Sequence, residues 1–518
     1  MTTPQEKLAE ALKALKSYQD KGLQAISASA LNRSHREHLL RAGFLRQVVR
    51  GWYVPSRPDE RPGDTTPWYA SMREFVAGYC NERFKQAWHL NPDHSLLLHS
   101  GERTLPKQLQ IWATGGNNQQ LALPHGCSLF IYRASVLLPA SAEADAGGIR
   151  LVELPHALVA AAPAFFTQNR IAAQVALALV PDASAVLRVL LAGGHAVAAG
   201  RLAGAFRAIG RADISDDILG AMRGAGYTIT EANPFEPVLP TAMPGDRTES
   251  PYVLRMRLMW VKMREIVIRT FPQSEGKPKD IDKLMEEVDA RYVTDAYHSL
   301  SIEGYRVSAG LIEKVRDGRW NPDDDAGDRE TRDTMAARGY YETHNLIKED
   351  ITRILNGDNP GTVFRKGLSR WYQALFSPSV QAGILRPEDL AGYRNNQVYI
   401  RGALHVPVSH DAVRDCMPAL FELMEAEEVA SVRAVLGHLI FVYIHPYMDG
   451  NGRLARFLMN AMLVPAGYVW TVIPVERRTD YMNALEQASS FDNIEPFATL
   501  VGELCEKQKS VPLPRPKE

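Results

Sequence analysis

One stretch of twelve residues gathers side chains suited to phosphate chemistry. Residues 445–456 read HPYMDGNGRLAR and follow an apolar run that is typical of a buried helix. That helix should end at His445, because Pro446 cannot continue it. Residues 449–452, Asp-Gly-Asn-Gly, predict a tight turn, since Gly and Asn tolerate positive φ. A second amphipathic helix is expected from about Gly452, with its core face toward the first.

The start of this second helix predicts an anion site. Its unpaired N–H groups and positive dipole end attract phosphate. Arg453 and Arg456 stand three residues apart on the first turn, where each guanidinium can fork onto phosphate oxygens. Asp449 is a hard oxygen ligand suited to Mg²⁺, and His445 titrates near neutral pH and can accept a proton from a hydroxyl. Together these residues predict transfer of a group from a nucleotide.

The alternative is a helix–turn–helix corner with a structural histidine and surface arginines. For any one of these residues that alternative is favoured. The complete set within so short a stretch favours the chemical interpretation.

HPYMDGNGRLAR resembles the H-P-F-x-D-G-N-G-R-x-x-R signature of Fic-domain proteins, with Tyr447 in place of Phe. The resemblance implies transfer of AMP from ATP to a Tyr, Ser or Thr hydroxyl of a target protein, with release of pyrophosphate. The implied roles are a catalytic base at His445, an Mg²⁺ ligand at Asp449, a phosphate cradle at Gly450, Asn451 and Gly452, a phosphate grip at Arg453 and orientation of the terminal phosphate by Arg456.

Two further features of this region are expected from the same resemblance. Residues 395–409, NNQVYIRGALHVPVS, predict a β-hairpin similar to the family's flap, which aligns a target segment by main-chain pairing. A purely structural hairpin is the alternative. Tyr481 corresponds to an aromatic residue placed near the adenine, with ordinary packing as the alternative.

A second motif precedes the signature. Residues 297–306 read YHSLSIEGYR, in which Ser299, Glu303 and Gly304 resemble the inhibitory S/T-x-x-x-E-G/N motif of Fic proteins. Four residues separate Ser299 from Glu303, so both lie on one helix face. The resemblance implies a salt bridge from Glu303 to Arg456 that withholds this arginine from the γ-phosphate. In some relatives the same glutamate serves removal of AMP, so the reverse reaction stays open.

The first 57 residues predict a DNA-binding module. Helical periodicity, a short polar helix ending at Gly43 and two strands joined at Arg50-Gly51 follow the order of a winged helix, with three helices before the hairpin. The stretch resembles the N-terminal domain of AbiEi-type antitoxins and related transcription regulators. Protein contact is the alternative use. The candidate DNA-contacting residues are Arg33, Ser34, Arg36, Arg41 and Arg50, with Asn32 and Arg46 beside them.

The elements that must position these residues suggest a multidomain chain. The expected fold class is a mainly α Fic domain, a helical bundle with a β-hairpin flap, preceded by an α+β winged helix and a mixed α/β regulatory domain. The expected boundaries are a winged helix at 1–57, a mixed α+β AbiEi-like domain at 65–230, a Pro-rich linker at 231–251, a Fic domain with its inhibitory helix at 252–507 and a disordered tail at 508–518.

Within the second domain the pattern is mixed. Three apolar runs predict strands, at 95–100, 107–115 and 127–134. The Ala/Leu-rich segment from about 152 to 226 predicts helices. Residues 252–507 read as helical except for the hairpin at 395–409.

Composition narrows the function classes. The chain has 518 residues, 45% of them hydrophobic, and a formal net charge of −1, which excludes a uniformly basic nucleic-acid-coating protein and an acidic disordered chain. The first 50 residues hold nine basic and four acidic side chains, a local charge of +5 that favours DNA. The N-terminus lacks an apolar leader and no apolar run reaches the length of a membrane span. A cytoplasmic protein is therefore expected.

Other sites are rejected. The four cysteines are scattered, with neither a C-x-x-C pair nor a zinc pattern. The acidic segment 321–330 has its glycine at the seventh position and Arg332 at the twelfth, unlike a calcium loop.

Three hypotheses follow. The first is an autoinhibited protein adenylyltransferase that uses ATP and Mg²⁺, fused to a DNA-binding regulatory half. The second is an antitoxin-like transcription regulator whose Fic domain is quiescent. The third is a Fic enzyme that removes AMP or uses another nucleotide donor.

Overall fold

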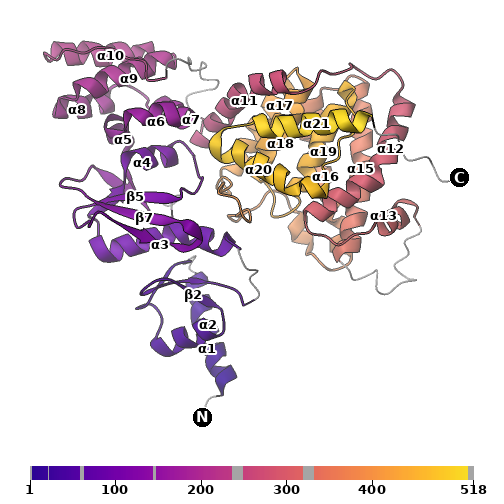
Figure 1. Cartoon of the computed structure of the whole chain (residues 1–518), viewed down its shortest axis with the longest axis horizontal. Coiled ribbons are helices and arrows are strands. Elements are labelled where there is room, and N and C mark those ends of the chain that lie inside the picture. The colour runs from indigo at the N-terminus through magenta and orange to yellow at the C-terminus, as the bar shows by residue number, and fades with distance from the viewer. Residues whose placement is uncertain are drawn as a thin grey trace. The chain divides into compact units, whose positions relative to one another are not determined.

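The computed structural model divides the chain into two compact units (Figure 1). Unit 1 comprises Met1–Arg255 together with Tyr399–Val406, and unit 2 comprises Met256–Val398 and Pro407–Glu518. The residues that the structure describes are 3–20, 23–58, 64–143, 147–235, 249–318 and 332–510. The acidic segment 321–330, most of the proline-rich segment and residues 511–518 lie outside this described part.

Unit 1 begins with a small helix-and-sheet module. Its elements are α1 (Pro4–Gln19), β1 (Ile26–Ser27), α2 (Arg33–Arg41), β2 (Leu45–Val49) and β3 (Trp52–Pro55), with an antiparallel sheet of order β1-β3-β2. The hairpin that turns at Arg50-Gly51 is confirmed. The prediction of a third helix is wrong for the described residues. In its place, the short strand β1 pairs with β3. This pairing buries Ile26 almost completely.

A mixed sheet follows. Four strands lie in the order β4-β5-β7-β6, with β5 parallel to β7 and the other neighbours antiparallel. Helix α3 contributes eight of the buried apolar side chains that share a core with this sheet. The elements are α3 (Thr66–Phe84), β4 (Trp88–Leu90), β5 (Gln108–Ala113), β6 (Gln119–Ala122), β7 (Ser128–Arg133), β8 (Ala140–Ala142) and β9 (Arg150–Val152). The strands expected at 107–115 and 127–134 are thus confirmed.

The strand expected at 95–100 is wrong. These residues belong to helix α4 (Pro92–His99). The side chain of Asn91 accepts a hydrogen bond from the N–H of His94, and Pro92 occupies the first turn. A capping residue followed by proline favours a helix start, and this outweighs the strand-like run of leucines.

Helices complete unit 1, as the Ala/Leu-rich segment predicted. They share one apolar core with α4. They are α5 (Leu154–Ala160), α6 (Pro163–Gln168), α7 (Arg170–Ala178), α8 (Ser184–Gly193), α9 (Ala196–Ala208) and α10 (Ala212–Gly224).

Unit 2 is mainly helical (Figure 1). Helix α18 packs on α19, and α15 on α16. The helices are α11 (Pro251–Thr270), which begins in the last residues of unit 1, α12 (Ile281–Ile302), α13 (Ala309–Arg316), α15 (Arg332–Leu355), α16 (Pro360–Gln381), α17 (Val413–Ala426), α18 (Ala430–Ile444), α19 (Asn451–Leu463), α20 (Arg478–Phe491) and α21 (Glu495–Lys509). No helix in the described ranges is long and apolar enough to cross a bilayer.

The β-hairpin expected at 395–409 is wrong as a pair of strands. The described residues there form a loop with a tight turn, in which Ala403 N donates to Ile400 O. Side chains replace a main-chain ladder across its base. Gln397 Nε2 donates to the carbonyl of Pro407, a residue that has no N–H to offer in return.

Candidate functional site

The loop between α18 and α19 carries the signature residues. His445 closes α18 in the left-handed conformation, with φ of 54°, and its N–H donates to Phe441 O at 2.9 Å. Its ring Nδ1 lies 3.3 Å from the carbonyl of Val442. A carbonyl only accepts, so in a neutral imidazole this contact places the proton on Nδ1 and the lone pair on Nε2. This tautomer is the one that the predicted role of His445 as a base requires.

Asn451 braces this loop. Its Oδ1 accepts from Tyr447 N at 3.0 Å and its Nδ2 donates to Tyr447 O at 2.8 Å. Gly450 precedes it with φ of 83°, and a Cβ there would lie 2.8 Å from Phe376. The glycine is required both by its conformation and by the closeness of this ring. The asparagine thus supports the turn from within.

Arg453 is buried beneath the turn. It is 1% exposed, and its guanidinium lies 5.0 Å from the ring centres of Tyr305 and Phe376. Its Nη2 lies 3.4 Å from Asp449 Oδ2, while Nε and Nη2 have no hydrogen-bond partner among the described residues. Buried donors without partners are costly. A phosphate oxygen would satisfy them.

Arg456 is held by the preceding motif. Its Nε donates to Ser299 Oγ at 2.9 Å, and its Nη2 donates to Ser299 O at 3.1 Å and to Glu303 Oε1 at 2.8 Å. Burial opposes the charge of this guanidinium, but the carboxylate of Glu303 prevails and raises the pKa of Arg456. The structure thus brings together the two motifs that sequence reasoning had linked.

Glu303 also fills space above the turn. It follows the last residue of α12, and Gly304 beside it has φ of 87°. A Cβ at Gly452 would clash with Glu303 Oε1. The carboxylate therefore occupies room directly over the start of α19, where an anion would be received.

Tyr481 lies in the interior. It is 1% exposed, and its hydroxyl is 2.9 Å from His438 Nε2. Burial raises its pKa to about 12, against the effect of nearby Arg456. The ring is thus placed in the surroundings of Arg456, and a contact with adenine stays a prediction.

Two residues that sequence reasoning missed support this arrangement from α12 and α15. Asp295 Oδ2 accepts a hydrogen bond of 2.6 Å from Tyr340, and both side chains are buried. Asp295, Ser299 and Glu303 recur every four residues, so they form one stripe on α12. Burial raises the pKa of Asp295 to about 6, although the bond from Tyr340 opposes this shift. In the sequence, the spacing of four residues between Asp295, Ser299 and Glu303 could have indicated that Asp295 belongs to the site.

The free energy of unfolding should depend on Asp295 in a defined interval. The folded protein retains this proton up to about pH 6, whereas an unfolded aspartate releases it near pH 4. The folded state then binds more protons, so stability falls as pH rises through that interval. In Asp295→Asn, whose oxygen still accepts from Tyr340, this loss of about 1–3 kcal/mol should disappear. Denaturant unfolding at each pH measures it.

Asp282→Asn, on the exposed first turn of the same helix, is the matched control for that experiment. It should retain the pH dependence of the unchanged protein. Equal pH dependence in Asp295→Asn and the unchanged protein would contradict the role assigned to Asp295.

Arg394 is a third residue that sequence reasoning missed. It is buried, its Nε donates to His445 O at 2.8 Å and its Nη2 donates to Val408 O at 2.5 Å. Its own N–H donates to Pro446 O at 2.9 Å. One arginine thus joins the loop that carries His445 to the base of the segment 395–409. Nothing in its sequence context distinguishes it from surface arginines.

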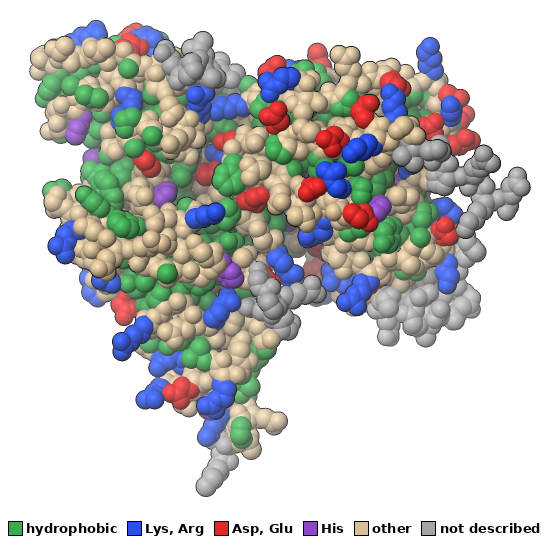
Figure 2. Space-filling view, viewed as in Figure 1, with side chains coloured by type: hydrophobic (Ala, Val, Ile, Leu, Met, Phe, Trp, Pro, Cys, Tyr) green, Lys and Arg blue, Asp and Glu red, His purple; other side chains and the backbone are tan. Residues whose placement is uncertain are grey.

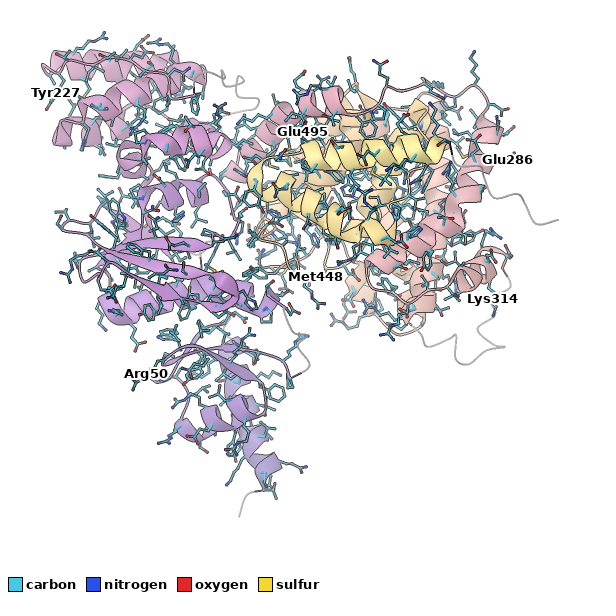
Figure 3. All side chains as sticks on the ribbon, in the orientation of Figure 1. Arg50, Tyr227, Glu286, Lys314, Met448 and Glu495 are labelled. Atoms are coloured by element: carbon cyan, nitrogen blue, oxygen red, sulfur yellow. The ribbon has the colours of Figure 1, made fainter. Side chains whose placement is uncertain are left out.

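A groove lies beside the loop between α18 and α19. Its volume is about 970 Å³, and Arg394, Tyr447, Met448 and Asp449 are among its lining residues. Met448 is 56% exposed and projects from the loop between α18 and α19 (Figure 3). The described residues contain no group of three or more metal-ligating side chains. Half-exposed Asp449 fits an ion that takes one carboxylate and completes its shell with phosphate and water.

The candidate DNA-binding residues lie in unit 1. Arg33, Ser34 and Arg41 are exposed on α2, and Arg50 projects from the β2–β3 turn (Figure 3). Arg36 differs, because its Nη1 donates to the carbonyl of Ala28 at 2.7 Å and so supports the fold. Figure 2 shows Lys and Arg side chains gathered on the visible face of this module.

Comparison with known proteins identifies part of the chain. Residues 366–463 match the Fic/DOC family, which confirms the Fic domain over these residues, the signature included. Protein adenylyltransferase Fic of Drosophila willistoni is 36% identical over 223 residues, and that of Drosophila mojavensis is 35% identical over the same length. Each match covers 42% of this chain and 40% of the relative. The chain thus spans about two fifths of the curated relatives it matches.

Solved structures show weaker similarity. A Fic-domain signaling protein of Bacteroides thetaiotaomicron is 17% identical, with 49% of this chain and 93% of that chain covered and a TM-score of 0.32. Fic-1 of C. elegans is 17% identical, with 65% and 90% covered and a TM-score of 0.33.

Proposed function

We propose that this protein is an autoinhibited protein adenylyltransferase that moves AMP from ATP to a hydroxyl of a target protein. The observation that carries the proposal is the grip of Ser299 and Glu303 on Arg456. Burying a charged pair costs desolvation free energy. Its position beside a phosphate-type turn therefore supports a regulatory role for this pair. The similarity to proteins named protein adenylyltransferase Fic supports the same activity.

The proposed reaction uses His445 as base. The target hydroxyl oxygen attacks the α-phosphorus of ATP, and its proton passes to Nε2 of His445. The new bond joins that oxygen to the α-phosphorus, while the bond from the α-phosphorus to the bridging oxygen breaks. Pyrophosphate leaves with the electron pair of that bond. The contact of Nδ1 with Val442 O supports this role, because it directs the lone pair to Nε2.

Phosphate binding falls to the start of α19. The N–H groups after Gly450 and the unpaired donors of Arg453 supply an anion site with a favourable helix dipole. Asp449 would hold Mg²⁺, which neutralises phosphate charge when bound. Arg456, once released, would orient the γ-phosphate. In this proposal, a bound phosphate would supply hydrogen-bond partners to the buried Nε and Nη2 of Arg453.

Removal of AMP and use of another nucleotide donor remain alternative activities of the same site. Glu303 lies close enough to Gly452 to act near a bound phosphate, which is the observation that favours the first. The cytoplasmic location also stays a prediction.

Mass spectrometry tests the proposal. Cell lysate treated with Glu303→Gly protein and ATP should contain proteins heavier by one AMP on Tyr, Ser or Thr. A different added mass would indicate another donor. Absence of any added mass in the presence of fresh ATP would contradict the proposed activity.

We also propose that the N-terminal module binds DNA through α2. The exposed guanidinium groups of Arg33, Arg41 and Arg50 support this, since helix arginines read base edges or neutralise phosphates. Arg33 Nε forms an ion pair of 2.7 Å with Glu37 Oε1. Exposed pairs of this kind are weak, so a DNA phosphate can replace the carboxylate.

Loss of Arg33 and Arg41 together should weaken DNA binding about tenfold and lower the slope of log affinity against log salt by about two. Fluorescence anisotropy with a duplex, measured at several salt concentrations, gives both quantities. Arg188→Ala with Arg223→Ala removes two exposed arginines elsewhere in unit 1 and serves as the control. Equal slopes for the two double variants would contradict DNA binding through α2.

A further inference from the structure

Part of the expected flap belongs to the core of unit 1. Residues 399–406 are grouped with residues 1–255 by their contacts. Val406 is 3% exposed and is a member of the same apolar cluster as Leu105, and Leu404 and Tyr399 pack against that cluster. The cluster also contains side chains of α3, β5 and β7. The burial of Val406 in this cluster indicates that the tip packs on unit 1 rather than only on the rest of its own loop.

Main-chain groups of this tip are already engaged within unit 1. The carbonyl of Leu404 accepts from Leu105 N at 3.0 Å, and the N–H of Gly402 donates to Thr65 Oγ1 at 3.3 Å. Arg401 adds an ion pair of 3.3 Å with Asp64. Strand addition of a target to a flap requires unpaired main-chain N–H and C=O groups. At the tip, two of these groups are bonded to residues of 1–255, and two more, Ala403 N and Ile400 O, are bonded to each other.

From these contacts we infer that unit 1 carries a docking site for the flap tip and that a target must displace it. The occupant is residues 399–406 of this chain. The inference rests on the proposed function and on the expectation that residues 395–409 align a target segment. It adds a second restraint on transfer, which acts on the target side and is independent of the hold of Glu303 on Arg456.

Hydrogen exchange of the full-length chain tests the docking by itself. Residues 399–406 should exchange slowly in the unchanged protein. The double variant Asp64→Lys with Thr65→Val repels Arg401 and removes the acceptor of Gly402, without a change in the flap itself. It should raise exchange over 399–406 about fivefold, since each lost contact shifts the docked population. Exchange over 399–406 in the unchanged protein as fast as in a free peptide would overturn the inference.

The activity arm uses the same double variant in the Glu303→Gly background. The probe is ATP labelled at its α-phosphate with clarified cell lysate as the source of targets. Label incorporation into protein should be about fivefold faster than with Glu303→Gly alone. Faster exchange over 399–406 without faster incorporation would overturn the inference. Val406→Asp, which forces a carboxylate out of the apolar cluster, is the second releasing variant.

A matched control completes the design, and the two experiments separate failure of the docking from failure of the proposed function. Val197→Asp places the same side chain at a valine that is 84% exposed in unit 1, and it should change neither readout. If Glu303→Gly alone transfers no label, the proposed function fails, while the exchange experiment still decides whether the flap tip is docked.

Discussion

Glu303→Gly is expected to raise the rate of AMP transfer by about a hundredfold. In the unchanged protein Glu303 Oε1 accepts from Arg456 Nη2 at 2.8 Å. Under the proposed autoinhibition, this contact withholds the guanidinium from phosphate. One preorganised donor to developing charge is commonly worth a factor of about 10² to 10³ in rate. Glu303 lies just beyond α12, where glycine costs less helix stability than it does within a helix, so folding should be maintained. Initial rates with α-labelled ATP measure the effect.

The control is Glu286→Gly on the same helix (Figure 3), a side chain for which the structure gives no contact with Arg456. It costs helix stability of about 1 kcal/mol without freeing the arginine. Its transfer rate should equal that of the unchanged protein. Activation by both substitutions would mean that looser packing of α12, rather than release of Arg456, controls the rate.

Loss of the base should have an effect of similar size in the opposite direction. In the Glu303→Gly background, His445→Asn is expected to lower the transfer rate by about 10² to 10⁴, the usual contribution of a positioned base. Asparagine is chosen because His445 has φ of 54°, a conformation that asparagine tolerates better than alanine. The same labelled-ATP assay measures the loss, with a thermal melt to verify folding.

His410→Asn in the same background is the matched control. His410 lies in unit 2 with its side chain 41% exposed, apart from the signature. It should retain full activity. If label transfer persists undiminished in His445→Asn, the mechanism that assigns the proton to Nε2 is wrong.

Much of the fold was predictable where local signals decide structure. Pro446, Gly450 and Asn451 determine the break between α18 and α19, because proline ends a helix and the turn requires positive φ. The hairpin at Arg50-Gly51 was predictable for the same reason. Segment 95–100 was not, since its leucines satisfy either period and the capping group of Asn91 lies outside the run.

The segment 395–409 shows a different limit. It was predicted to form a two-stranded hairpin, which the structure does not contain. Gln397, Arg394 and Pro407 replace the ladder with side-chain bonds, and the apolar residues of the tip are buried in unit 1 rather than against each other. A pattern of hydrophobicity indicates that a residue will be buried but does not identify what buries it.

By itself, the sequence determined the chemical content of the candidate site: a base, a carboxylate, a glycine turn and two arginines within twelve residues, whose local backbone preferences place them in one loop. Only the tertiary structure decided which of these residues are buried and which partners they contact. Arg456 and Glu303 are 153 residues apart, and only the packing of α12 against α19 makes them an ion pair. The same holds for Asp295, whose pKa depends on burial, and for Val406, because long-range contacts are not encoded in any local pattern.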